Sequence, residues 1–98
     1  MIRVVYEWRV EASNQAAFIA ASGKTTTAIR DSVDGARRST LLRSKDSPQV
    51  FLSIARLDSE EQWKSFREGP DRTEMSEMHA LAERLSVNAY EEEGEFTV

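Results

Sequence analysis

His79 is the only histidine among the 98 residues, so any acid–base step through an imidazole depends on it. The ordinary imidazole pKa of about 6.5 suits proton transfer near neutral pH. His79 follows Met75 by four residues and precedes Ala82 by three, which places it on or beside the apolar stripe of a helix. It either faces a pocket between helix and sheet or lies at the border of the core with a backbone or water partner. One histidine without any cysteine does not make a dedicated zinc site, so we expect no metal.

Several aromatic residues are candidates for the wall of a single cavity: Tyr6, Trp8, Trp63, Phe66 and Tyr90. Such a slot suits a flat, apolar substrate, which a phenolic oxygen or an indole N–H can orient. Large rings also dominate small cores, so simple core packing is the alternative interpretation.

The other polar groups available to hold a reacting molecule are Asn88 and Arg43. We expect His79, Tyr6 and Asn88 to be catalytic, because they can accept a proton or donate hydrogen bonds to a developing negative charge. The residues expected to bind the substrate are Trp8, Trp63, Phe66, Tyr90 and Arg43.

Charged residues gather in two places. A basic cluster either keeps a strand edge solvated or binds an anionic group of a substrate. It consists of Arg37, Arg38, Arg43 and Lys45. The run of acidic residues at positions 91–93 is typical of a solvated segment. Adjacent residues of a strand alternate in direction, so this run does not provide the convergent geometry of a metal site.

A short stretch, Ser22-Gly23-Lys24-Thr25, resembles the end of a phosphate-binding loop. That motif needs a glycine five residues before the Gly-Lys pair, and Phe18 occupies the position. It also needs a preceding strand, whereas a helix is expected here. The stretch therefore does not predict nucleotide binding.

Length and composition define the class of protein. Ninety-eight residues suffice for one domain, and we treat 1–98 as a single domain. The net charge of −4 disfavours nucleic acid as a partner, and the absence of cysteine excludes disulfides, thiolate catalysis and iron–sulfur clusters. No apolar run approaches the roughly 20 residues of a membrane span, and the N-terminus lacks the layout of a signal peptide. We expect a cytoplasmic protein without a membrane partner.

The periodicity of apolar residues predicts four strands and three helices. The strands are expected at 1–10, 36–45, 49–57 and 87–90, and the second and third form a hairpin. The helices are expected at about 14–33, from a capping box at Ser59–Gln62 to Gly69-Pro70, and at about 72–85. The buried stripe of the first helix should be Phe18, Ala21, Thr25, Ala28, Ile29 and Val33. This order predicts an α+β fold of the ferredoxin-like, split βαβ type, with helices on one face of a four-stranded antiparallel sheet.

The face of the sheet opposite the helices should be polar if it meets water. It keeps apolar residues instead, including Val5 in the first strand and a full set in the third. Exposed patches of this kind mark interfaces, so we expect a homodimer that packs sheet on sheet. The tail at 95–98 can reach across and pair with the edge of the partner.

The chain resembles the antibiotic biosynthesis monooxygenase family from its first strand to about Leu85. The resemblance lies in the opening strand, residues 1–10, in 39–44 and 51–57, and in Ser59-Glu60-Glu61-Gln62-Trp63 with Phe66. It implies a dimeric α+β barrel. The family includes cofactor-free oxygenases of polycyclic aromatics, haem-degrading enzymes and processors of signal molecules. The haem-degrading members combine a strand asparagine, a helix tryptophan and a histidine; Trp8 and Phe66 stand in the first two places, and only His79 is kept.

The function implied by this resemblance is a monooxygenase that needs no cofactor and acts on a small aromatic or quinone-like metabolite. Such a reaction requires a substrate that becomes its own electron donor once it is deprotonated. The alternative is a non-catalytic dimeric barrel that binds a small hydrophobic ligand. Haem degradation is the third candidate, disfavoured by Trp8 and Phe66.

Overall fold

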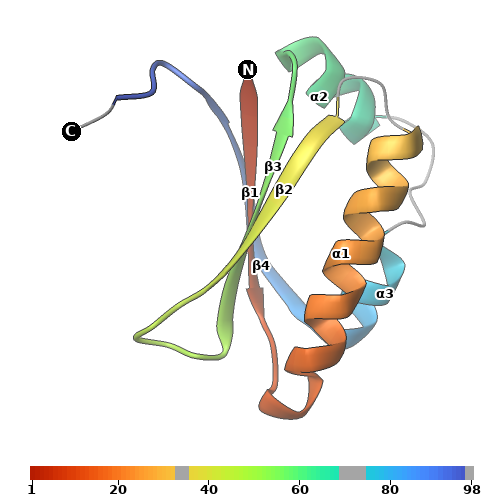
Figure 1. Ribbon diagram of the computed structural model, residues 1–98, viewed down its shortest axis with the longest axis vertical. Coiled ribbons are helices and arrows are strands. Elements are labelled where there is room, and N and C mark those ends of the chain that lie inside the picture. The colour runs from red at the N-terminus through yellow and green to blue at the C-terminus, as the bar shows by residue number, and fades with distance from the viewer. Residues whose placement is uncertain (33–35, 69–74, 97–98) are drawn as a thin grey trace.

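The computed structural model describes residues 1–32, 36–68 and 75–96. Four strands form one antiparallel sheet in the order β2-β3-β1-β4: β1 (Ile2–Arg9), β2 (Ala36–Arg43), β3 (Val50–Leu57) and β4 (Glu83–Glu91). A 3₁₀ turn, η1 (Ala12–Asn14), precedes α1 (Gln15–Ser32), and two shorter helices follow, α2 (Glu60–Glu68) and α3 (Ser76–Leu81). All three α-helices lie on one side of the sheet (Figure 1). The predicted ferredoxin-like α+β fold is confirmed.

β1 is one of the two inner strands of the sheet, and the alternation of its residues shows which face of the sheet is the core. Ile2, Val4, Tyr6 and Trp8 are buried under the helices, while the residues between them face the other side. The register of β1 with β3 opposes Tyr6 to Ser53 and Trp8 to Phe51, so these four side chains share the helix-facing side. The predicted central position of the third strand and its hairpin with the second are both confirmed.

α1 forms in spite of three consecutive threonines and Gly23, which weaken its intrinsic propensity. Ser22 Oγ and Thr26 Oγ1 donate hydrogen bonds to the carbonyl oxygens of Phe18 and Ser22, each at 2.8 Å. The buried face contains Phe18, Ala21, Ser22 and Thr25. Ala28 was expected in this buried stripe but is exposed. The helix is rotated so that Ser22 and Thr25 face the core.

The third helix is shorter than its apolar spacing predicts. α3 ends at Leu81, Ala82 is already extended, and β4 begins at Glu83, whereas we expected helix to position 85 and strand from 87. The last residues of β1 need backbone partners, and Glu83 and Arg84 supply them opposite Arg9 and Trp8. A bulge between Glu7 and Trp8 accommodates the change of register.

The predicted capping box at the start of α2 is present in part: the cap hydroxyl accepts from the helix, and the glutamine side chain contacts the cap hydroxyl in place of the cap backbone N–H. The backbone N–H of Gln62 donates to Ser59 Oγ at 3.3 Å, and the Ser59 hydroxyl in turn lies 3.5 Å from Gln62 Oε1. The expected helix boundaries at Asp34-Gly35, Gly69-Pro70 and Arg72 fall outside the described residues, as does Val33.

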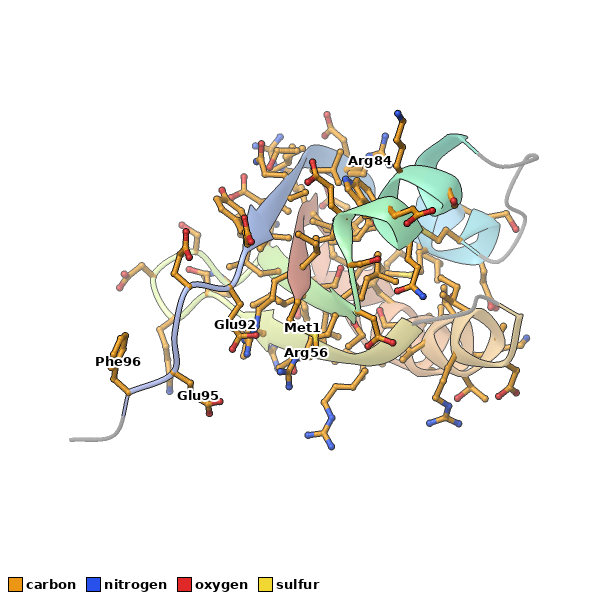
Figure 2. All side chains as sticks on the ribbon, turned by 90° about the horizontal axis from the view of Figure 1, so that it is seen from above. Met1, Arg56, Arg84, Glu92, Glu95 and Phe96 are labelled. Atoms are coloured by element: carbon orange, nitrogen blue, oxygen red, sulfur yellow. The ribbon has the colours of Figure 1, made fainter. Side chains whose placement is uncertain are left out.

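The acidic run after β4 is only partly solvated, contrary to our expectation. The Glu92 carboxylate lies 3.2 Å from Arg3 Nη2 and 3.6 Å from Arg56 Nη2, and its backbone N–H donates to Met1 O. Glu92 thereby ties the end of β4 to the first residues of β1. Beyond it, Glu95 and Phe96 extend away from the sheet, as Figure 2 shows from above. None of the helices in the described segments is long and apolar enough to span a membrane.

Candidate functional site

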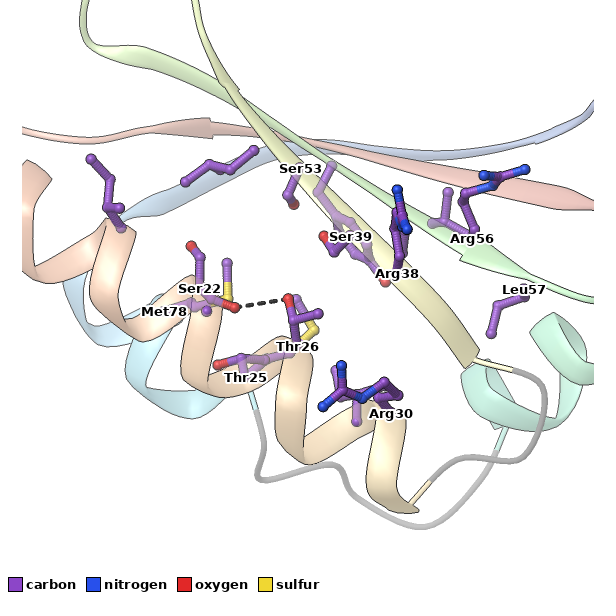
Figure 3. A pocket seen from close by; sticks show the side chains of 18 of the residues that line it. Ser22, Thr25, Thr26, Arg30, Arg38, Ser39, Ser53, Arg56, Leu57 and Met78 are labelled. Carbon is purple, nitrogen blue, oxygen red and sulfur yellow. Dashed lines mark hydrogen bonds between the residues drawn. The ribbon is translucent and has the colours of Figure 1, made fainter. Parts of the chain in front are cut away.

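A pocket of about 310 Å³ lies between α1 and the helix-facing side of the sheet. This volume is at the lower end of the range for small-molecule sites. Most of the wall is apolar, and the residues that form this part are Val4, Ile19, Ile29, Leu41, Ala55, Leu57, Trp63, Met75 and Met78. Figure 3 shows polar side chains of α1 and of the strands that also line the pocket. The pocket suits a small, mostly apolar molecule.

Two hydroxyl-bearing residues on neighbouring strands of the sheet line this pocket. Tyr6 of β1 and Ser53 of β3 are directly opposed in the antiparallel register, and both are buried. Both residues line the same pocket, so a bound molecule can meet a hydroxyl from each of the two strands. Trp8, which is not among the lining residues, donates a hydrogen bond from Nε1 to Ser53 Oγ at 3.1 Å.

The Tyr6 hydroxyl is a proton donor at neutral pH. Burial raises its pKa above the ordinary value of 10.0, and the nearby positive charge of Arg84 only partly opposes this effect. The phenol therefore stays neutral, and it can stabilise a negative charge that develops on a bound molecule.

Positive charge lies along part of the same pocket. Arg38, a member of the predicted basic cluster, lines it from β2, and Arg30 lines it from α1 (Figure 3). None of the described lining residues is acidic, although the chain as a whole carries a net charge of −4. The carboxylates of Asp31 and Glu92 partly offset Arg30 and a third lining arginine, Arg56, at 3.9 Å and 3.6 Å, and the remaining positive potential favours an anionic form of the bound molecule.

His79 lies outside this pocket. Its ring packs on Trp8 with centroids 5.2 Å apart, and it lines a shallow recess with Arg9, Glu11 and the residues at 80–83. Desolvation lowers the pKa of His79 below 6.5, and the charge of Arg84 lowers it further. The imidazole is thus neutral at pH 7. It contacts Trp8 and does not line the pocket.

The structure separates the other predicted site residues. Trp63 lines the pocket with Tyr6, and Trp8 lies behind Ser53. Asn88 opposes Val5 and Tyr90 opposes Arg3, so both face the side of the sheet away from the pocket. The five rings therefore do not line one cavity.

Arg43 and Phe66 complete the set. Arg43 donates to Gln15 Oε1 at 3.1 Å, and its guanidinium lies 5.5 Å from the centre of the Phe51 ring, away from the pocket lining. The side chain of Phe66 lies outside the described residues.

Sequence reasoning missed Ser53 and Arg30 as pocket residues. The signal for Ser53 was present, because period two places this serine between Phe51 and Ala55 on the face that meets the helices. A lone polar residue on a buried strand face needs a hydrogen-bond partner, and such a residue is a candidate for a site. No comparable signal distinguished Arg30, which depends on how α1 packs on β2.

The fold and the pocket define a small α+β domain with a largely apolar pocket between its helices and its sheet. The profile of the antibiotic biosynthesis monooxygenase family matches residues 1–78, and the chain belongs to this family. None of the curated proteins matches this chain.

Solved structures of similar fold come from several bacteria. A single-residue variant of SnoaB, described as a cofactor-independent oxygenase from Streptomyces nogalater, superposes with a TM-score of 0.77 at 19% identity, over 96% of this chain and 94% of that one. A candidate antibiotic biosynthesis monooxygenase from Deinococcus radiodurans gives 0.77 at 18% identity, over 100% and 98%. Rv0793 from Mycobacterium tuberculosis gives 0.71 at 19% identity, over 98% of each chain. At such identities the similarity establishes the fold.

Proposed function

We propose that this protein is a monooxygenase that uses no bound cofactor and oxidises a small aromatic or quinone-like metabolite. One observation carries the proposal: two buried hydroxyl-bearing residues on neighbouring strands, Tyr6 and Ser53, line the wall of an otherwise largely apolar pocket. Membership of the monooxygenase family and a fold shared with an oxygenase described as cofactor-independent support it.

The reaction needs a substrate with an activated methylene group, such as an anthrone. Loss of one C–H proton gives an anion whose charge spreads onto the neighbouring oxygen, and this anion donates electrons to O₂. The methylene becomes a carbonyl with one atom of O₂, and the other atom leaves as water with the two hydrogens. Hydrogen-bond donors in a dry pocket stabilise such an anion far better than they do in water.

The chain supplies the stabilising groups. Tyr6 and Ser53 donate to the oxygen of the anion, Trp63 and Met78 pack on its rings, and Arg30 and Arg38 raise the local potential. The only ionisable groups among the described lining residues are Tyr6 and arginines, so the C–H proton passes to water at the open side of the pocket. The catalytic role expected for Tyr6 is thus donation of a hydrogen bond.

Replacing Tyr6 by phenylalanine tests this role. Tyr6→Phe keeps the ring and removes the hydroxyl, so we expect kcat to fall roughly tenfold with KM little changed, since one charge-assisted hydrogen bond of about 1.5 kcal/mol is lost. The measurement is oxygen uptake by metal-free protein with an anthrone-type substrate. Thr27→Val, which removes an exposed hydroxyl of α1 outside the pocket lining, is the comparison, and we expect it to retain turnover. Unchanged kcat in Tyr6→Phe would remove the phenol from the mechanism.

We also propose that the active form is a homodimer joined through the face of the sheet without helices. Half-buried Val5, Leu52 and Ile54 lie on this face, with exposed Leu42 and Tyr90 beside them. No helix in the described part of the chain covers it (Figure 1). A second copy buries these side chains on a twofold axis and also covers Asn88, so any contribution of Asn88 and Tyr90 comes from this interface.

A charge at the centre of this face should separate the subunits. We expect the wild-type protein to sediment at twice the chain mass of 11.1 kDa, and Ile54→Glu to sediment as a monomer. Thr27→Glu, on the exposed surface of α1, is the matched control and should remain dimeric. A wild-type monomer at micromolar concentration would contradict the dimer.

The alternative of a binding protein without turnover has one observation in its favour. The sole histidine lies outside the pocket, and the described lining residues offer no group that is a base at neutral pH. A protein of this kind gains thermal stability on adding an anthrone or anthraquinone, but it consumes no oxygen.

A further inference from the structure

Ser53 is a polar residue on the buried face of β3, where Phe51 and Ala55 flank it at period two. Its side chain is almost fully buried, and a buried hydroxyl is costly unless it forms hydrogen bonds. One bond is in place, from the Nε1 of fully buried Trp8 to Ser53 Oγ at 3.1 Å.

The direction of this bond is fixed by chemistry. An indole N–H can only donate, so Ser53 Oγ must be the acceptor. The hydroxyl proton of Ser53 is therefore left for a different partner. Within residues 1–32, 36–68 and 75–96, no protein acceptor for it is found, and Ser53 lines the pocket. The free donor is thus available to a bound molecule.

The neighbouring Tyr6 hydroxyl belongs to the same wall. Tyr6 is directly opposed to Ser53 in the register and lines the same pocket, so a bound molecule can meet a hydroxyl from each strand. Hydrogen-bond donors in a pocket that excludes water stabilise a negative charge on an oxygen atom.

We infer that Ser53 is a second oxyanion donor of this pocket and that Trp8 is its positioning residue. The indole restricts the rotation of the Ser53 hydroxyl by occupying its acceptor side. Trp8 is itself held by the Phe18 ring at 5.4 Å and the His79 ring at 5.2 Å. This inference rests on the proposed function. It adds that the substrate oxygen lies next to the Ser53 hydroxyl. Trp8, expected to bind substrate directly, acts through Ser53 instead.

The ionisation of a bound phenol tests this assignment without any turnover. The probe is 1-hydroxyanthraquinone, whose absorbance changes when its hydroxyl loses a proton. We expect wild-type protein to lower the pKa of the bound probe relative to water. Ser53→Ala should raise that pKa by roughly one unit, a tenfold change in ionisation, because one donor to the phenolate is lost. Ser53→Thr keeps the hydroxyl and should restore the wild-type value.

Trp8→Phe tests the positioning role, since it removes the N–H and keeps an aromatic ring. We expect it to raise the probe pKa in the same direction as Ser53→Ala, and the double variant to add little, because both changes act through one hydroxyl. Thr27→Val, which removes an exposed hydroxyl of α1 that does not line the pocket, is the control and should leave the pKa unchanged.

Each outcome decides something. A Ser53→Ala protein that binds the probe with wild-type pKa overturns the role of Ser53, and an unchanged pKa in Trp8→Phe overturns that of Trp8. Failure of folded wild-type protein to bind the probe overturns the pocket assignment and this inference together. A shifted pKa in a protein that consumes no oxygen leaves the inference standing and overturns the proposed function alone.

Discussion

Replacing Thr26 by tryptophan should weaken ligand binding in the pocket strongly while the fold persists. Thr26 lines the pocket from α1, and an indole in its place projects into the cavity of about 310 Å³. The lost ligand contacts and the strain of overpacking together amount to about 3 kcal/mol, so we expect affinity for an anthraquinone to fall roughly 100-fold and turnover to fall with it. The measurement is titration of the intrinsic tryptophan fluorescence or calorimetry.

Thr27 provides a closely matched control. It is the next residue of the same helix, and its Oγ1 donates to the carbonyl oxygen of Gly23 just as Thr26 Oγ1 donates to that of Ser22. Thr27 is exposed and does not line the pocket. Thr27→Trp should therefore bind like wild type. Equal affinities for the two tryptophan variants would place the ligand elsewhere on the molecule.

The largest loss of stability is expected from Trp8→Ala. Trp8 is fully buried, packs on Phe18 and His79, and satisfies Ser53 with its N–H. Truncating a ring in such a position leaves a cavity and an unpaired hydroxyl, which together cost about 3–5 kcal/mol of unfolding free energy. Urea denaturation followed by circular dichroism measures the change.

A large ring at the opposite extreme of exposure is the control. Phe96 is 90% exposed, and the described structure places it on the extended tail beyond Glu92. Phe96→Ala should leave the unfolding free energy of the isolated chain unchanged to within about 0.5 kcal/mol. Equal losses for Trp8→Ala and Phe96→Ala would show that Trp8 is not part of the core.

The fold could be predicted from a few strong patterns. The alternation of apolar residues in β1 determined its buried face, and the apolar residues on both faces of β3 indicated a central strand. The end of the third helix could not be predicted, because Met75, Met78 and Ala82 continue a helical spacing into a segment that pairs with β1. Long-range strand pairing overrode local periodicity there.

The site was harder to predict than the fold. Residue types identified Tyr6 and Trp63, but only the register shows that Asn88 and Tyr90 face the other side of the sheet. His79 lies beside the apolar stripe of its helix. The Trp8 ring contacts both His79 and Ser53, and His79 itself does not line the pocket. Several expectations stay predictions. They are the substrate, the cytoplasmic location, and the absence of a cofactor, of a nucleic-acid partner and of a membrane partner.

The incorporation of oxygen from ¹⁸O₂ tests the central claim most directly. Metal-free protein is incubated with an anthrone under ¹⁸O₂, and the product is analysed by mass spectrometry against the background of spontaneous oxidation. We predict a quinone that carries one ¹⁸O atom, formed with the uptake of one O₂ per quinone, and a rate that Thr26→Trp reduces to background. Quinone formation at the background rate in the presence of protein that demonstrably binds the anthrone would contradict the account.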